Sequence, residues 1–274
     1  MADANDQPVS PVVQMESVTV EFDDYLAISE VSLEIRPNVT TLVMGLSGSG
    51  KSTLLKVAAG LIPPSFGRVT ILGHAMRGMS DRELLELRRS AGFVFQEAAL
   101  WQNMNIYRNL EVPLEHQLPQ LGREERRKRI QSTLSKFRFP RDLSLRPSVL
   151  SSGEAKIISF VRSTITGPSL LFLDEPTSFV DRSNQARILE RMRTLKREGT
   201  TLVIVTHNPK VAAQLADRVV VLAEGEVIAH GTMDEVSASD DERVHEVLEE
   251  VLGDAVTYDE DLLSLLASTE EADR

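Results

Sequence analysis

The chain has 274 residues, of which 42% are hydrophobic and 26% are charged, as in an ordinary globular protein. It contains no cysteine, which excludes disulfides and thiolate metal sites. No apolar run approaches the roughly 20 residues that span a bilayer, and the polar stretch 1–8 has none of the features of a signal peptide. We therefore expect the protein to stay in the compartment in which it is made.

The net charge of −11 is concentrated at one end of the chain. Residues 238–274 hold 13 acidic and 2 basic side chains, which accounts for the whole net charge and leaves 1–237 balanced. A body without a basic excess does not favour nucleic acid as the main partner. The pattern instead predicts an acidic tail, 233–274, attached to a neutral core.

Residues 1–11 are expected to form a disordered lead-in, and strands are predicted at 12–22 and 31–35. Phe22 and Tyr25 lie where the first strand gives way to a polar loop. An aromatic side chain in this place can stack on a purine ring or pack at the sheet edge, and the residues alone favour packing.

The stretch 45–52, Gly-Leu-Ser-Gly-Ser-Gly-Lys-Ser, fits the phosphate-binding pattern G-x-x-x-x-G-K-[ST]. An apolar run at 41–44 predicts a buried strand before it, and 53–59 predicts a helix after it. Glycines let backbone N–H groups point at phosphate oxygens, at the positive end of the helix dipole. Lys51 is then expected to reach the β- and γ-phosphates and Ser52 to bind Mg²⁺, whereas a plain glycine-rich turn is the alternative. The predicted ATP-binding residues here are Gly45, Ser47, Gly48, Ser49, Gly50, Lys51, Ser52 and Thr53.

Next come a predicted turn at 63–67, a strand at 68–73, and a helix that opens with a capping box at Ser80 and Glu83. The strand predicted at 92–96 ends in Gln96, whose polar side chain either lies at the surface or projects into the nucleotide site.

From 97 to about 166 the pattern changes to helices and loops, which predicts a helical insertion. Its basic run, 123–129, is interleaved with glutamates and predicts a solvated helix face rather than a phosphate or membrane patch. The expected breakers within this insertion are Asn105, Pro113, Pro119, Pro140 and Pro147.

The apolar strand 170–173 is followed directly by Asp174 and Glu175. Asp174 is expected to hold Mg²⁺, and Glu175 to act as the general base for the attacking water, although a capping pair without chemistry is the alternative. After a predicted helix at 182–198, the strand 201–206 ends at His207. This histidine either bonds the γ-phosphate or is an ordinary polar residue. Short strands are predicted at 219–222 and 227–229, on either side of a turn at 224–226.

These polar residues all follow strand ends. In open α/β sheets, ligands bind at the carboxyl ends of the parallel strands. The P-loop, Gln96, Asp174, Glu175 and His207 are therefore expected to meet at one edge of the sheet.

Over residues 12–232 the sequence resembles the ATP-binding subunits of ABC transporters. The resemblance rests on the P-loop as Walker A, Gln96 as the Q-loop, 150–154 as the signature, 170–175 as Walker B, 178–181 as the D-loop and His207 as the switch histidine. It implies a P-loop NTPase α/β core, a mixed sheet with flanking helices, which carries an inserted helical subdomain at 97–166 and a short antiparallel β part. It also assigns Phe22 to adenine stacking, with Tyr25 as the fallback.

The resemblance further implies that two copies pack head to tail. Each ATP with its Mg²⁺ then lies between one Walker A and the opposite signature, where Ser151 and Gly153 open a helix, and Asp181 belongs to the same ATP-binding set. Glu175, His207 and Gln96 are the implied catalytic residues, and Ser52, Gln96 and Asp174 the implied metal ligands. A membrane permease is expected to sit on the helical subdomain and the Q-loop.

The signature departs from the usual LSGGQ, because Ser152 replaces the first glycine and Glu154 the glutamine. A carboxylate at 154 adds negative charge near the opposite nucleotide. We therefore expect it either to slow closure or to depend on a nearby cation.

The stretch 95–114, with its FQ-x-x-AL, M-N and N-x-x-x-PL pattern, is similar to the ATPases of Mla/MCE lipid-transport systems. That similarity implies transport of phospholipid or another hydrophobic molecule, an MCE-type substrate-binding protein in the complex, and a peripheral location on the cytoplasmic side of the inner membrane. The alternatives are an importer for small polar solutes and a non-transport ATPase that regulates a cell-wall partner. An ATPase that acts on nucleic acid is disfavoured, because neither tandem cassettes nor long coiled-coil insertions are present.

The acidic tail carries apolar residues at helical spacing. We expect a helix that docks on its own core or on the twin subunit, with solvated disorder as the alternative. The first stripe is Val244, Val247, Leu248, Val251 and Leu252, and a second apolar patch is Leu262, Leu263, Leu265 and Leu266.

Overall fold

The structure, a computed structural model, describes residues 10–256, with side chains to residue 252. Most of the predicted lead-in 1–11 and the second apolar patch of the tail (262–266) therefore lie outside the described residues. Among the helices of the described part, none is long and apolar enough to cross a membrane.

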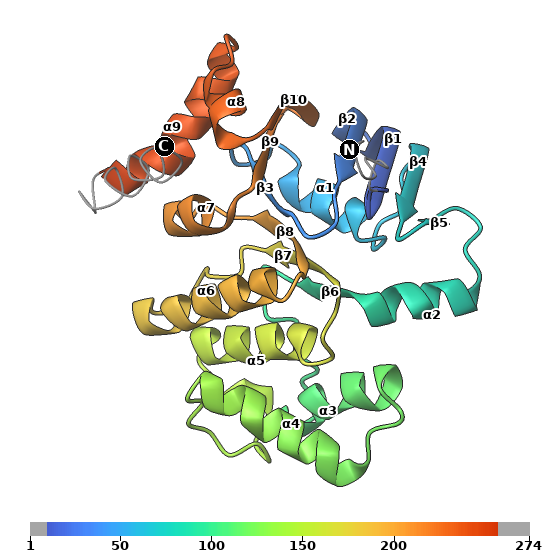
Figure 1. Cartoon of the computed structure of the whole chain (residues 1–274), viewed down its shortest axis with the longest axis vertical. Helices are drawn as coiled ribbons and strands as arrows, with labels where there is room; N and C mark the ends of the chain where they lie inside the picture. Colours follow the sequence, from blue (N-terminus) through green and yellow to red (C-terminus); the bar gives the residue numbers. More distant parts are fainter. Residues whose placement is uncertain (1–9, 257–274) are drawn as a thin grey trace, which may run out of the picture.

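A six-stranded sheet forms the centre of the molecule (Figure 1). Neighbouring strands in this sheet run parallel, except at one edge, where β10 runs antiparallel to β9. Every residue of β3, β7 and β8 is buried, as expected for parallel strands covered on both faces. In sheet order the strands are β10 (Glu226–Gly231), β9 (Arg218–Ala223), β3 (Thr40–Met44), β8 (Thr201–Val205), β7 (Leu170–Asp174) and β6 (Ala91–Val94).

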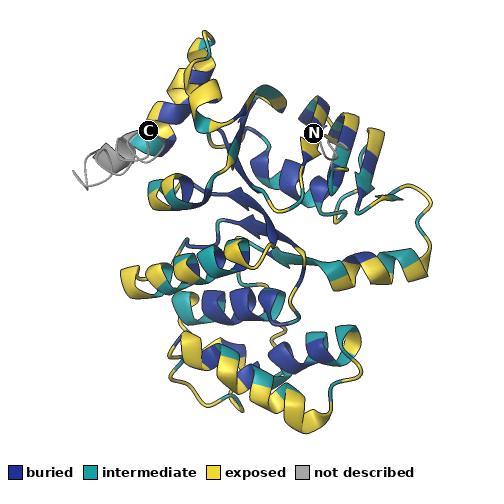
Figure 2. Cartoon of the chain, in the orientation of Figure 1, coloured by how far each residue is buried: buried dark blue, intermediate teal, exposed yellow. Residues whose placement is uncertain are grey.

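The two faces of this sheet belong to two separate apolar clusters, because side chains alternate along a strand. Leu42 and Met44 face a cluster built with helices α3 to α7 and α9, whereas Val43 faces a cluster built with α1 and the second sheet. Figure 2 shows the buried strands between the two covering layers. The helices are α1 (Lys51–Ala58), α3 (Ile106–Gln117), α4 (Arg123–Lys136), α5 (Ser152–Thr164), α6 (Arg182–Arg197), α7 (Pro209–Leu215) and α9 (Glu242–Val256).

The second sheet is a small antiparallel one with the order β2-β1-β4-β5. Tyr25, expected in a loop, instead begins β2, where it pairs with Phe22 across a tight hairpin. The capping box at Ser80 and Glu83 is confirmed at the start of α2. The elements are β1 (Val13–Phe22), β2 (Tyr25–Ile35), β4 (Phe66–Ile71), β5 (His74–Ala75) and α2 (Asp81–Ser90).

The segment between β6 and β7 contains helices and loops, but Pro113 does not break it as expected: it lies inside α3. A proline inside a helix costs about 3 kcal/mol. Burial of an apolar side chain contributes about 1.5–3 kcal/mol, and Ile106, Leu110 and Leu114 form a completely buried stripe on this helix. The burial of these three side chains therefore outweighs the cost of placing Pro113 inside the helix.

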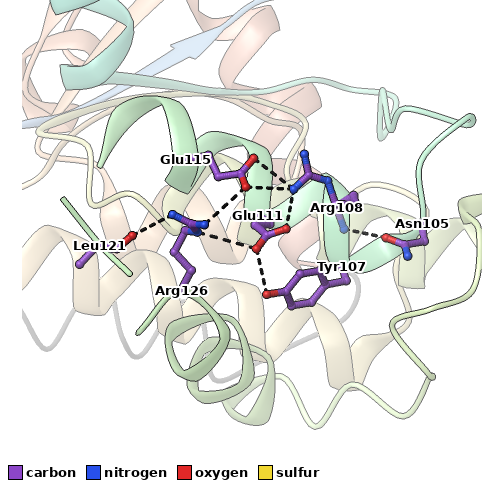
Figure 3. A network of polar contacts seen from close by, with 7 residues as sticks. All are labelled: Asn105, Tyr107, Arg108, Glu111, Glu115, Leu121 and Arg126. Carbon is purple, nitrogen blue, oxygen red and sulfur yellow. Dashed lines mark hydrogen bonds and ion pairs between the residues drawn. The ribbon is translucent and has the colours of Figure 1, made fainter. Parts of the chain in front are cut away.

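A polar network joins α3 to α4 (Figure 3). Buried Glu111 accepts from the Tyr107 hydroxyl at 3.1 Å and from Arg108 at 2.6 Å, and pairs with Arg126 at 3.7 Å. Most of the basic run on α4 is exposed, as predicted, but Arg126 turns inward. The carboxylate is thus compensated, and the two helices are fixed to each other.

The chain ends its described course in α8 (Met233–Ser237) and α9. Val244, Val247, Leu248 and Val251 are buried on the first apolar cluster, with α9 in contact with α7, β3 and β9. The apolar stripe of the tail thus docks on the chain's own core.

Candidate functional site

The P-loop joins β3 to α1 through backbone shapes that only glycine adopts readily. Gly48 and Gly50 have φ of 80° and 99°, in the left-handed region. A Cβ on Gly50 would lie 2.5 Å from the carbonyl oxygen of Ala27, so no side chain fits there. A Cβ on Gly48 would meet nothing within 4 Å, so the loop faces open space at this point. The N-terminus of α1 is thus presented to an anion.

Lys51 folds back over this loop. Its ammonium donates to the carbonyl oxygens of Gly45 at 2.6 Å and of Leu46 at 2.7 Å. Burial lowers the pKa of Lys51. An ammonium has three N–H donors, so one remains for a ligand in the open space.

Ser52 and Asp174 together present oxygen atoms that could hold a metal ion. The Ser52 hydroxyl donates to the Asp174 carboxylate at 3.0 Å, which joins α1 to the end of β7. Asp174 is 2% exposed, and burial raises its pKa. One hydroxyl and one carboxylate fit Mg²⁺, which usually keeps several waters and substrate phosphates as its other ligands.

Glu175 and His207 face each other beside that pair. The backbone N–H of His207 donates to the Glu175 carboxylate at 3.1 Å, and the ring Nε2 lies 3.7 Å from the same oxygen. Burial, with the neighbouring Asp174, raises the pKa of Glu175 to about 7. Burial, with nearby Lys51, lowers the pKa of His207. A carboxyl group with raised proton affinity beside an anion-binding loop is suited to take a proton from water.

These groups surround one cavity of about 550 Å³. The stretches that follow β3, β6, β7 and β8 all reach it, so the structure brings together the strand ends that the sequence placed at one edge. Asp174 is joined to it through Ser52. The residues that line the cavity are Tyr25, Ser47, Gly48, Gly50, Lys51, Ser52, Thr53, Gln96, Glu175, Ser178, Val205 and His207.

The aromatic residue on this cavity is Tyr25, whereas Phe22 is not among its lining residues. The Tyr25 hydroxyl donates to the carbonyl oxygen of Gly48 at 3.3 Å. The reason lies in strand order: β2 runs beside the P-loop, as the closeness of Ala27 to Gly50 shows, and β1 lies one strand farther out. Of the two aromatic residues, the fallback Tyr25 is thus the one that lines the cavity, and adenine stacking by either residue stays a prediction.

The signature lies apart from the cavity. Ser151 caps α5, and together with Asp181, the N-cap of α6, it lines a different cavity of about 290 Å³. Gly153 packs against the D-loop, since a Cβ on it would lie 3.5 Å from the carbonyl oxygen of Phe179. A single chain thus holds the two halves of the implied ATP site at separate places.

Glu154, which replaces the glutamine of the usual signature, has a charged partner. Its carboxylate accepts from Arg141 Nε at 2.7 Å, and it also accepts the backbone N–H of Ser151 at 2.9 Å in a capping box. These bonds lower the pKa of Glu154, the Arg141 side chain most of all. Of the two alternatives expected for Glu154, slower closure or dependence on a nearby cation, the second has its cation in Arg141.

Sequence reasoning missed Lys156. It is 2% exposed, and its ammonium donates to the carbonyl oxygens of Phe95 at 2.8 Å and Gln96 at 2.7 Å. Burial lowers its pKa to about 8. A lysine within the apolar run that follows the signature was the available signal, because a charge on the buried face of a helix needs a partner.

Comparison with known proteins gives one family. A family model described as "ABC transporter" matches residues 28–178. The methionine import ATP-binding protein MetN 2 of Rhodococcus jostii is 34% identical over 233 residues, which are 83% of this chain and 68% of that protein. MetN of Carboxydothermus hydrogenoformans is 33% identical over 211 residues, 77% of this chain and 62% of that protein.

A further relative is the probable export ATP-binding/permease protein MacB of Pseudomonas entomophila, 32% identical over 80% of this chain and 33% of that protein. The chain therefore spans less than two thirds of several of these relatives. Among solved structures, a post-hydrolysis dimer of an ATP-binding cassette bound to ADP and Pi superimposes with a TM-score of 0.75 and 30% identity, over 81% of this chain and 98% of that one.

Proposed function

Because the chain belongs to the ABC transporter family, we propose that it is the ATP-hydrolysing subunit of an ABC transporter, working as a dimer that drives a separate membrane permease. The observation that carries this proposal is the cavity at the strand ends, where the P-loop, the Ser52–Asp174 pair and Glu175 meet. The signature on the same chain lies elsewhere, so a second copy is needed to complete the site.

In this proposal ATP lies along the P-loop with its phosphates at the N-terminus of α1. The free N–H of Lys51 reaches the terminal phosphates, and Tyr25 offers a ring for the base. Mg²⁺, held by Ser52 and Asp174 with Gln96 nearby, neutralises phosphate charge when bound.

Glu175 orients the attacking water and takes its proton, since burial has raised the proton affinity of its carboxylate. His207 is held beside Glu175 by its backbone N–H and can donate a hydrogen bond to the γ-phosphate.

The second copy contributes Ser151 and Gly153 at the N-terminus of α5. Backbone N–H groups and the helix dipole favour the γ-phosphate there. ATP then holds the closed dimer together, and hydrolysis releases it.

The permease is proposed to dock where the Q-loop leads into α3. Trp101 is 41% exposed at this place and lies under the Arg162 guanidinium, 4.9 Å from the ring centroid. Arg162 belongs to α5, so the signature helix and the docking surface are physically joined. The location that follows is the cytoplasmic side of the inner membrane.

For the cargo we propose phospholipid or another hydrophobic molecule, with an MCE-type substrate-binding protein in the complex. The support is the pattern of residues 95–114, which includes the Q-loop residue Gln96 and runs into α3. A small polar solute is the second candidate, since proteins named as methionine import subunits are about one third identical to this chain.

The motor proposal is tested with Glu175→Gln. This variant is expected to bind ATP, to form a stable dimer and to lose turnover, measured by phosphate release and light scattering. Hydrolysis at the wild-type rate would remove Glu175 from its role. The cargo is tested by purifying the complex from its native membrane: a multi-span permease with bound phospholipid supports lipid transport, whereas a solute-binding protein or a peptidoglycan-regulating partner argues against it.

A further inference from the structure

Phe179, in the D-loop, is 72% exposed, more than any other large apolar side chain that the structure describes. Its φ of 61° lies in the left-handed region, which bulky residues rarely adopt. Such strain persists only where the surroundings impose it, and it gathers at functional sites. An exposed aromatic ring held in a strained position calls for a binding partner.

The D-loop that displays Phe179 is anchored on both sides. Before it, the Ser178 hydroxyl donates to the carbonyl oxygen of Glu175 at 2.9 Å. After it, Asp181 caps α6 by accepting the backbone N–H groups of Ser183 and Asn184. Phe179 is therefore presented from a fixed position, which keeps the entropic cost of binding low.

Phe179 also lies next to the signature helix. A Cβ on Gly153 would lie 3.5 Å from the Phe179 carbonyl oxygen and 3.6 Å from Val180 Cα. The backbone of the D-loop is therefore a direct neighbour of the signature helix, and a partner that covers that helix also lies close to Phe179. In the dimer proposed above, that partner is the Walker A loop of the second copy.

The Walker A loop has an unused cavity on its other side, here called the rear cavity, of about 340 Å³. It shares Ser47 and Gly48 with the nucleotide cavity, so the two hollows adjoin across one loop. Helix α9 of the acidic tail supplies its outer wall. The residues that line the rear cavity are Leu46, Ser47, Gly48, Ser49, Ala223, Glu224, Arg243, Glu246 and Val247.

The chemistry of the rear cavity suits an aromatic ring. Leu46, Ala223 and Val247 supply apolar surface, and the guanidinium of Arg243, held by Asp241 at 2.7 Å, can lie over a ring face. A cavity of about 150 Å³ is sufficient for benzene, so the ring of phenylalanine fits.

We infer that the rear cavity receives the partner subunit's Phe179 when the dimer closes on ATP. The contact is reciprocal, because a two-fold dimer uses both cavities and both rings alike. Helix α9 of the acidic tail is then part of the dimer interface, because its residues line the rear cavity. This inference rests on the ATP-driven dimer of the proposed function.

Cross-linking tests the contact directly, since the chain has no cysteine of its own. In the Glu175→Gln background, Phe179→Cys is combined with Glu246→Cys, at the exposed rim of the rear cavity, and treated with a short bis-maleimide. An ATP-dependent cross-linked dimer is expected. His245→Cys serves as the matched control: it is exposed on the same helix but does not line the cavity, and its pair with Phe179→Cys should stay monomeric.

A second measurement follows dimerisation of Glu175→Gln with ATP by light scattering. Adding Phe179→Ala should weaken the dimer by at least about tenfold, the size expected for a buried aromatic anchor. Phe66→Ala, which removes another exposed ring far along the antiparallel sheet, should change it less than about twofold.

The possible outcomes distinguish a failure of the proposed function from a failure of the Phe179 contact alone. If Glu175→Gln alone forms no dimer with ATP, the proposed function fails. If it does dimerise, but Phe179→Ala dimerises equally well and no cross-link to position 246 forms, only the Phe179 contact is overturned. Cross-linking of Phe179→Cys to itself across the two-fold axis would also overturn it.

Discussion

The ammonium of Lys156 lies 2.7 Å from the carbonyl oxygen of Gln96, although 60 residues of chain separate them. Lys156 is part of α5, the helix that Ser151 opens, and Gln96 begins the Q-loop. The bond therefore ties the signature helix to the segment that links the nucleotide cavity with the helical subdomain. We therefore expect a shift of the signature helix to be accompanied by a shift of the Q-loop.

We expect Lys156→Met to destabilise the protein by about 2–6 kcal/mol. The substitution removes the shared donor of two partly buried hydrogen bonds, and each acceptor left without a partner costs about 1–3 kcal/mol. Urea unfolding measures the loss, with Lys136→Met, an exposed lysine of α4, as the control expected to stay within about 0.5 kcal/mol. ATPase activity should fall more than ATP affinity. A variant as stable and active as the wild type would show that the hydrogen bonds of Lys156 contribute neither to stability nor to activity.

Lys51→Ala is expected to lose nucleotide binding altogether, or nearly so. The variant removes the ammonium that lies over the P-loop and offers its remaining donor to the phosphates. Titration with a fluorescent ATP analogue measures the loss. Lys56→Ala, in the same helix but not on the cavity, should bind ATP with little change. Binding by Lys51→Ala at wild-type affinity would contradict the assignment of the P-loop.

Tyr25→Ala is expected to weaken ATP binding, whereas Phe22→Ala should change it little. Stacking of an aromatic side chain on a base contributes about 1–3 kcal/mol, which corresponds to about a 5- to 150-fold loss of affinity. Tyr25 lines the cavity and Phe22 does not, although the two are cross-strand neighbours with similar exposure. The reverse ranking in a titration would restore Phe22 as the stacking residue.

The parts of the site that the sequence could predict are those set by local pattern. The Gly-rich loop before Lys51 specifies its own backbone shape, and a parallel sheet brings Asp174 and His207 to the same edge. These inferences need only the period of the strands and the positions where they end.

The parts that the sequence could not predict depend on register and on burial. Tyr25 lines the cavity and Phe22 does not, because β2, and not β1, lies beside the P-loop. Lys156 resembles a surface lysine until its helix is placed against the Q-loop. Pro113 is retained inside α3 because packing outweighs its local cost. In each case tertiary contacts decide between local alternatives.

The pair formed by Arg141 and Glu154 makes the most discriminating test of the altered signature. Glu154 replaces the usual glutamine and would place an uncompensated carboxylate near the opposite ATP, but Arg141 lies 2.7 Å away and balances it. The same carboxylate caps α5 through the N–H of Ser151. Charge balance and helix capping are therefore separable by mutation.

Arg141→Ala is expected to lower the ATPase rate by about 5- to 30-fold, the effect of losing about 1–2 kcal/mol of compensation beside a second negative charge. Glu154→Gln alone should be mild, because a glutamine side chain can still accept at the helix N-terminus. The double variant Arg141→Ala with Glu154→Gln should recover most of the lost rate, which a purely structural role for Arg141 would not allow. Steady-state phosphate release at saturating ATP measures all four proteins. If the double variant is as slow as Arg141→Ala, the arginine acts through something other than the charge at position 154.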